Sequence, residues 1–153
     1  MALRNDAIVR VANELNSGIA VLNGTTIGTL GSNTNGVTIE TAGTYGTRII
    51  SLIASTDDAS LSPNVFLYIL RGGSTVVPIG LVNVPISAGN TNAARFVTDF
   101  LNGTNIPGLP IDNTGRQYIP LVAGDVLRAT TLANLTAGRS CWITSFAQDF
   151  VAP

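Results

Sequence analysis

Two adjacent carboxylates, Asp57 and Asp58, are the residues whose types and spacing come closest to a catalytic pair. Two carboxylic acids suffice for glycoside hydrolysis, because one protonates the leaving group while the other acts as base or nucleophile. The acids that could supply such a pair are Asp57, Asp58, Asp99, Asp112, Asp125 and Asp149. Aspartate favours turns, so we interpret the pair at 57–58 as solvated turn carboxylates. A carboxylate-based glycoside hydrolase remains the remote alternative.

Most other enzyme chemistry lacks its usual side chains. The chain of 153 residues contains no histidine and no lysine, and all eight basic residues are arginines. Histidine supplies most general bases and many metal ligands, and lysine supplies Schiff bases and phosphate contacts. We therefore predict that the protein is not an enzyme and that it uses no cofactor.

Metal binding has only weak candidates. Gly124-Asp125 and Asn113-Thr114-Gly115 look like fragments of calcium loops, but no run has the alternating acidic spacing of such a loop. An oxygen-ligand site built from distant loops stays open, and we predict none. Cys141 is the single cysteine, and we expect it to be a buried thiol.

The distribution of charged residues argues against nucleic acid as a partner. The net charge is −1 and the arginines are scattered along the chain, whereas nucleic-acid binding needs clustered basic residues.

The sequence also lacks the patterns of membrane and secreted proteins. No apolar run reaches the length of a membrane helix. The N-terminus has no secretory pattern, because Arg4, Asp6, Arg10 and Glu14 interrupt it. We predict no nucleic-acid partner, no membrane and synthesis in the host cytoplasm.

Composition points to association with other chains. Only 11% of the residues are charged and 45% are hydrophobic, which leaves little charge to cover an isolated surface. Two runs, Arg48–Ile53 and Val65–Leu70, are apolar on both faces, so each needs cover on both sides. We expect a neighbouring subunit to give the second cover, and a homotrimer is our preferred oligomer.

The pattern of strand-like runs and turns predicts an all-β, antiparallel, jelly-roll-like β-sandwich. We place strands at Val37–Glu40, Thr47–Ser55, Val65–Arg71, Val76–Val84, Tyr118–Leu121, Asp125–Leu132 and Ser140–Phe150. One segment, 91–103, has helical spacing and ends in glycine, so we expect a short helical turn there. In the last strand Trp142, Phe146 and Phe150 share one face, and we expect this aromatic face to pack in the core.

Residues 1–36 differ from the rest, and we divide the chain into an N-terminal arm and hairpin (1–36) and the sandwich (37–153). Asn23-Gly24 lies between two apolar runs and predicts a hairpin joining 19–22 to 25–30. The segment around Ile8 fits either a short helix or a strand. We expect the arm to contact a partner through Arg4, Ile8, Val9, Arg10, Val11, Leu15, Ile19 and Val21.

Several motifs resemble one known family. They are the entry Thr41–Ile49, the hairpin Val65–Gly73, the turn at 107–112 followed by Tyr118–Leu121, and the run Ala123–Thr131. In order and spacing these resemble the jelly-roll decoration, or cement, proteins of tailed-phage heads, over residues 37–150. The resemblance implies a trimer seated on the capsid surface between subunits of the major capsid protein, without catalysis. A trimeric receptor-binding or fibre-tip module of a virion is the alternative.

Overall fold

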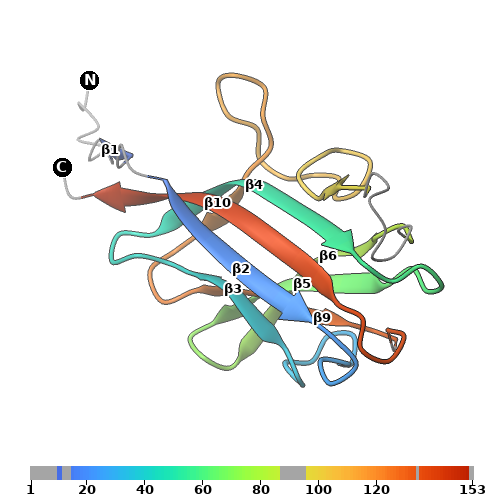
Figure 1. The fold of residues 1–153 in the computed structure, drawn as a ribbon. Helices are drawn as coiled ribbons and strands as arrows, with labels where there is room; N and C mark the ends of the chain where they lie inside the picture. Colours follow the sequence, from blue (N-terminus) through green and yellow to red (C-terminus); the bar gives the residue numbers. More distant parts are fainter. Residues whose placement is uncertain (1–9, 12–14, 87–95, 134, 152–153) are drawn as a thin grey trace, which may run out of the picture.

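The fold is built from strands alone. The computed structural model describes residues 10–11, 15–86, 96–133 and 135–151, and these form two packed antiparallel sheets (Figure 1). No helix occurs among these residues. The expectation of an all-β, antiparallel sandwich is confirmed.

Ten strands follow one another along the chain. They are β1 (Arg10–Val11), β2 (Asn16–Leu22), β3 (Val37–Thr41), β4 (Thr47–Thr56), β5 (Asn64–Arg71), β6 (Thr75–Asn83), β7 (Thr98–Asp99), β8 (Ile119–Leu121), β9 (Val126–Thr131) and β10 (Cys141–Val151). All seven strands expected from Val37 onward are present, and each observed strand end lies within one residue of the expected end. Strong β-formers bounded by Gly, Pro and Asn turns explain this agreement.

The first sheet is centred on the long strand β10. One edge of β10 pairs with β2 and, further along, with β1, while the other edge pairs with β4. Strand β4 then pairs with the short strands β7 and β8. Figure 1 shows β2, β10 and β4 side by side in the front layer.

The second sheet has the order β3-β9-β5-β6 and lies behind the first. Strand β5 is apolar and buried on both faces, with Val65, Leu67 and Ile69 facing the core between the sheets. The core between the sheets is lined by fully buried side chains such as Leu22, Leu52, Leu67, Leu127 and Ile143. Burial of this apolar area is the main source of stability.

The expected hairpin at Asn23-Gly24 is not formed, and this prediction was wrong. A turn does occur there, with the Thr26 amide donating to the Asn23 carbonyl at 3.0 Å. However, β2 pairs with β10 over seven residues and not with the chain that follows it. Two of its residues, Ala20 and Leu22, lie in the core. Residues 16–22 of this segment therefore form a strand of the first sheet.

Residues 23–36, here called the cover segment, pack on the outer face of the second sheet. The Gly28 amide donates to the Thr131 carbonyl at 2.8 Å, and the Tyr68 hydroxyl donates to Asn33 Oδ1 at 2.8 Å. The aromatic side chains on this face, Phe66 and Tyr68, are 1% and 0% exposed. The second cover of β5 thus comes from the same chain, and the expectation of a neighbouring subunit at this strand was wrong.

The cover segment approaches the sheet very closely. A Cβ added at Gly36 would lie 1.7 Å from the Tyr68 hydroxyl, and one added at Gly28 would lie 2.5 Å from Thr130 Oγ1. Glycine is required at both positions because no side chain fits between the segment and the strands. The small glycine residues of the cover segment thus permit close packing on the sheet.

The helical turn expected over 91–103 is not found in its described part. Residues 96–103 hold the short strand β7, which pairs with Ile53 and Ala54 of β4, followed by turns. Phe100, which helical spacing placed on one face with Phe96, is fully buried, whereas Phe96 is 65% exposed. Residues 91–95 lie outside the described part of the chain.

Candidate interaction surface

The carboxylates at 57–58 are structural and not solvated, which corrects the expectation from the sequence. Asp57 is 7% exposed and Asp58 is 1% exposed. Asp58 Oδ1 accepts the amides of Ser60 and Leu61 at 2.9 and 3.0 Å, and Oδ2 accepts the Thr136 amide at 2.7 Å. Burial alone would raise the pKa of Asp58, but these hydrogen bonds outweigh it and lower the pKa.

Asp57 makes a parallel set of contacts. Its Oδ1 accepts the Ser140 amide at 2.7 Å, and its Oδ2 lies 3.8 Å from the Arg139 guanidinium. Together the two carboxylates fasten the turn after β4 to the turn before β10. Backbone amides donate hydrogen bonds to the carboxylate oxygens of both residues. The two carboxylates are therefore poorly placed to act as an acid–base pair on a substrate.

Asp125 is also buried and paired. It is 1% exposed, and it accepts two hydrogen bonds from Arg71, at 3.1 Å from Nε and 3.0 Å from Nη2. The bonds to Arg71 lower the pKa of Asp125, and they are helped by the Val122 amide. This residue, which resembled a calcium ligand in the sequence, stabilises the turn that joins β8 to β9.

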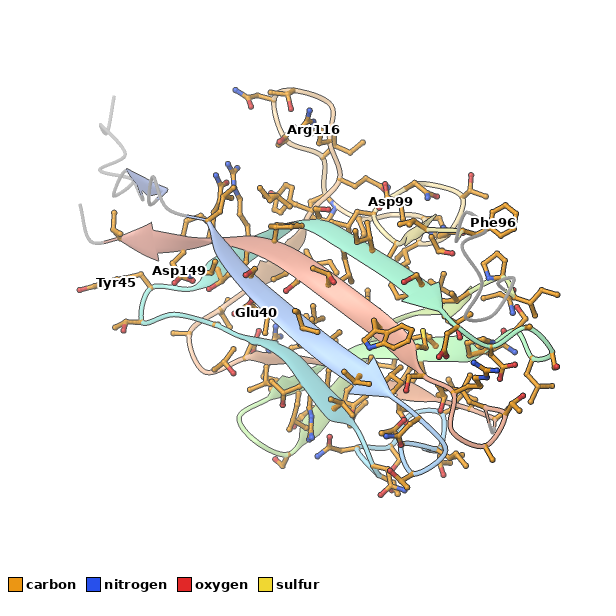
Figure 2. All side chains as sticks on the ribbon, viewed as in Figure 1. Glu40, Tyr45, Phe96, Asp99, Arg116 and Asp149 are labelled. Atoms are coloured by element: carbon orange, nitrogen blue, oxygen red, sulfur yellow. The ribbon has the colours of Figure 1, made fainter. Side chains whose placement is uncertain are left out.

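Of the remaining candidate acids, Asp99 and Asp112 cap turns, and Asp149 accepts hydrogen bonds from Asn16 and Thr47. Asp99 accepts the Leu101 amide at 2.9 Å, and Asp112 accepts the amides of Thr114 and Arg116 at 2.8 and 3.0 Å. Figure 2 shows Asp99 and Asp149 far apart on the molecule. In the described part of the chain no cavity large enough for a small ligand is formed, and no three His, Cys, Asp or Glu side chains converge.

Cys141 is a buried structural thiol, as expected. The side chain is fully buried in the core. Burial, together with the charge of Asp57, raises the pKa of the thiol to about 12. The thiolate required for nucleophilic chemistry is therefore absent at neutral pH.

An uncharged surface lies on the outward side of the first sheet. We call it the outer face and define it by three rows of residues that lie opposite one another across β2, β10 and β4. The rows are Val21–Trp142–Ser55, Ile19–Thr144–Ile53 and Ser17–Phe146–Ser51. None of the nine side chains is charged, and none is buried. Figure 2 is viewed onto this sheet.

The apolar residues of the outer face are exposed to a degree unusual for a central sheet. Ile19 is 67% exposed, Val21 is 41% exposed and Phe146 is 37% exposed. Isolated exposed apolar residues are normal, whereas a contiguous group is typical of an interaction site. At the end of the three rows, Arg48 Nε donates to Gln148 Oε1 at 2.8 Å and marks the polar border.

The structure brings three of the expected interface residues to one region. Leu15, Ile19 and Val21 are exposed on or beside β2. Arg10 and Val11 form β1, whose backbone pairs with Val151 and Phe150. The other three expected residues, Arg4, Ile8 and Val9, lie outside the described part of the chain.

The prediction that the aromatic face of β10 packs in the core was wrong. The period-two split was right, because Cys141, Ile143 and Ala147 share one side of the strand and are fully buried. The aromatic residues lie on the other side of the strand, because Trp142 and Phe146 belong to the outer face. The small buried residues were the available signal, because a narrow space between two sheets fits Cys and Ala better than Trp.

A second exposed region lies at the ends of the strands. Phe96 and Val97, beside β7, are 65% and 61% exposed, and Tyr45 is 57% exposed at the opposite end of the molecule (Figure 2). A hairpin-like loop closed by the pairing of Ile111 with Gln117 projects from the body and carries Arg116. These residues are dispersed and form no continuous face.

Comparisons with known proteins give no family. No family model matches the chain, and no curated protein matches it. Among solved structures it is similar to a chain of the cyanophage Pam1 capsid asymmetric unit, with 12% identity over 99% of this chain and 92% of that chain and a TM-score of 0.42. It is also similar to a pentameric capsid protein from metagenomic phage sequences, with 18% identity over 99% and 74% and a TM-score of 0.40.

Scores of this size do not establish a common fold, so the two capsid proteins say what the chain is similar to and nothing about what it does. The described part of the chain contains no helix that is both long and apolar enough to cross a membrane.

Proposed function

We propose that this chain is a virion structural protein that decorates a phage capsid and stabilises it by binding between subunits of the major capsid protein. The observation that carries the proposal is the outer face, with its exposed Ile19, Val21 and Phe146 and no charge in three rows. Such a face is desolvated at low cost when it meets another protein, because no ion has to leave water.

The topology supports the same proposal. The strand orders are β2-β10-β4 with β7 and β8 in one sheet, and β3-β9-β5-β6 in the other. We infer that these are the two interleaved sheets of a jelly roll, an architecture that occurs in viral capsid domains. The motifs that resemble those of phage decoration proteins lie on the turn from β3 into β4 (Thr41–Ile49) and on β9 with the turn before it (Ala123–Thr131).

The chemistry of the candidate acids also favours a structural role. Asp57, Asp58 and Asp125 are buried and hold turns together. Their carboxylates are occupied by backbone amides or by arginine, as in a protein whose task is to keep a fixed shape. We propose a homotrimer as the decorating unit, located at the capsid surface after synthesis in the host cytoplasm.

Decoration would stabilise a shell by mass action. A protein that binds only the assembled shell stabilises it by RT ln(1 + [L]/Kd) at each site, and the gain is repeated at every equivalent site. The test is to prepare particles with and without the protein and to compare the temperature at which they release their genome. We expect release at lower temperature from the undecorated particles, and equal temperatures would contradict the proposal.

Two variants sharpen this test. Val21→Asp places a charge on the outer face without touching the core and should reduce the occupancy of the protein on particles. The matched control is Leu30→Asp, because Leu30 is 60% exposed but lies in the cover segment. Electron cryomicroscopy then separates the two virion functions: density over the shell supports decoration, whereas density confined to the tail tip supports a receptor-binding module.

A further inference from the structure

Strand β2 has a free edge without the features that normally prevent pairing. It pairs with β10 on one side, and no described strand pairs with it on the other. Its sequence, NSGIAVL, contains no charge and no proline. The inner side of β2 packs on β3, where the Ile39 carbonyl lies against Gly18. The edge itself carries no charge, proline or bulge over seven residues, and such an edge is a template for an additional strand.

The other sheet edges in the described part of the chain are protected. Strand β6 contains Pro78, and its pairing with β5 has a bulge. Strand β3 carries Glu40 and a bulge opposite β9. The edge beyond β4 is formed by strands of two and three residues, of which β8 contains Pro120. The contrast indicates that the β2 edge is kept free for a partner.

The path of the N-terminus decides which strand fits this edge. Strand β1 lies on the same edge of β10 as β2, with Arg10 opposite Val151 and Asn16 opposite Ala147. Residues 1–9 precede β1 and lie outside the described part of the chain. Nine extended residues reach about 30 Å, against about 23 Å for the seven residues of β2, so they are long enough to pair with β2 of a neighbouring copy.

Charge complementarity supports the same occupant. On the inner side of β2, Glu40 Oε2 lies 3.0 Å from the Cβ position of Gly18, and Asp149 Oδ2 accepts from Asn16 Nδ2 at 2.6 Å. Neither carboxylate forms an ion pair with a described residue. In an added strand Arg4, Asp6 and Ile8 would face one side of the sheet and Leu3, Asn5, Ala7 and Val9 the other. Pairing of Arg4 with Glu40 requires a register that keeps Asp6, on the same side, away from this carboxylate, and the other side extends the outer face.

We propose that residues 1–9 of one copy add as a strand to the free edge of β2 in a neighbouring copy. The contact joins two different surfaces, so it is heterologous, and it generates a ring when the rotation closes. The trimer proposed above is such a ring. The contact concerns copies of this chain only, and it does not depend on capsid binding.

The first experiment compares three proteins by native mass spectrometry at micromolar concentration. The wild-type chain should be an oligomer, whereas deletion of residues 2–9 and the variant Ile19→Lys should both be monomers. Lysine at an edge strand blocks pairing without entering the core. The control Leu30→Lys should remain an oligomer. A monomeric wild type, or an oligomer retained by both variants, overturns the proposal.

The second experiment tests the contact itself. Amide hydrogen exchange should show residues 16–22 protected in the wild type and less protected in the deletion variant, while β5 stays protected in both. Arg4→Glu and Glu40→Arg should each weaken self-association by about tenfold, and the double variant should recover part of the loss. Unchanged protection of β2, or a double variant no better than the worse single one, contradicts the proposed strand exchange.

Discussion

Asp58 and Thr136 are joined by two hydrogen bonds although they lie 78 residues apart. The Thr136 amide donates to Asp58 Oδ2 at 2.7 Å, and the Thr136 hydroxyl donates to Oδ1 at 2.9 Å. Asp58 also accepts the amides of Ser60 and Leu61. One carboxylate thus organises the turn after β4 and fixes the approach to β10, the strand at the centre of the first sheet.

Replacing Asp58 with alanine should destabilise the protein strongly. The change leaves three buried or partly buried amides without an acceptor, and such losses cost about 1–3 kcal/mol each before relaxation. We expect a decrease of about 3 kcal/mol in the free energy of unfolding, measured with urea. The matched control is Asp99→Ala, because Asp99 is exposed and accepts a single amide. Equal effects of the two changes would show that Asp58 is not a structural centre.

The pair formed by Asp125 and Arg71 should make stability depend on pH. The pKa of Asp125 is below its ordinary value of 3.8 because Arg71 donates to it. Since the folded pKa is the lower one, the stabilisation is complete above about pH 4 and is lost as the pH falls through the folded pKa. Arg71→Met should therefore lower stability at neutral pH, and the difference from the wild type should shrink in acid.

Urea unfolding at neutral and acid pH measures this difference. In an Asp125→Asn background the titrating group is gone, so Arg71→Met should have an effect that no longer varies across the same pH range. A difference between wild type and Arg71→Met that stays constant with pH in the native background would exclude this ion pair as its cause.

The strands were predictable from the sequence because their signals are local. Apolar runs bounded by turn residues identify β4 and β5, and alternation identifies β10, without knowledge of the fold. Partners at long range were not predictable: nothing near Asp58 in the sequence indicates Thr136, and nothing near Tyr68 indicates Asn33. The turn at Asn23-Gly24 was recognised, but its hairpin was wrong because β2 gains more core burial by pairing with β10.

The cover segment should depend on the fit between Gly36 and Tyr68. A methyl group at position 36 meets the Tyr68 hydroxyl, so Gly36→Ala should destabilise the protein. Tyr68→Phe alone removes the hydrogen bond to Asn33 and should cost about 1 kcal/mol. In combination the two changes should cost less than their sum, because the phenylalanine lacks the clashing oxygen.

Unfolding in urea of the four proteins in this cycle gives the coupling between the two positions. Gly24→Ala is the control within the cover segment, since an added Cβ there meets nothing within 4 Å. We expect it to leave stability nearly unchanged. Strict additivity of Gly36→Ala and Tyr68→Phe would mean that the segment does not pack on Tyr68 as described.

Two residues of β10 should respond in opposite ways to the same substitution. Ile143 is fully buried and faces the core, whereas Phe146 is 37% exposed and faces outward. Ile143→Asp places a carboxylate among apolar side chains and should prevent folding. Phe146→Asp should change the free energy of unfolding by about 1 kcal/mol or less but should abolish binding to particles, because it adds a charge to the uncharged outer face. Circular dichroism and co-sedimentation with undecorated particles measure the two effects, and a folded Phe146→Asp protein that binds as tightly as the wild type would show that the outer face is not the contact with the shell.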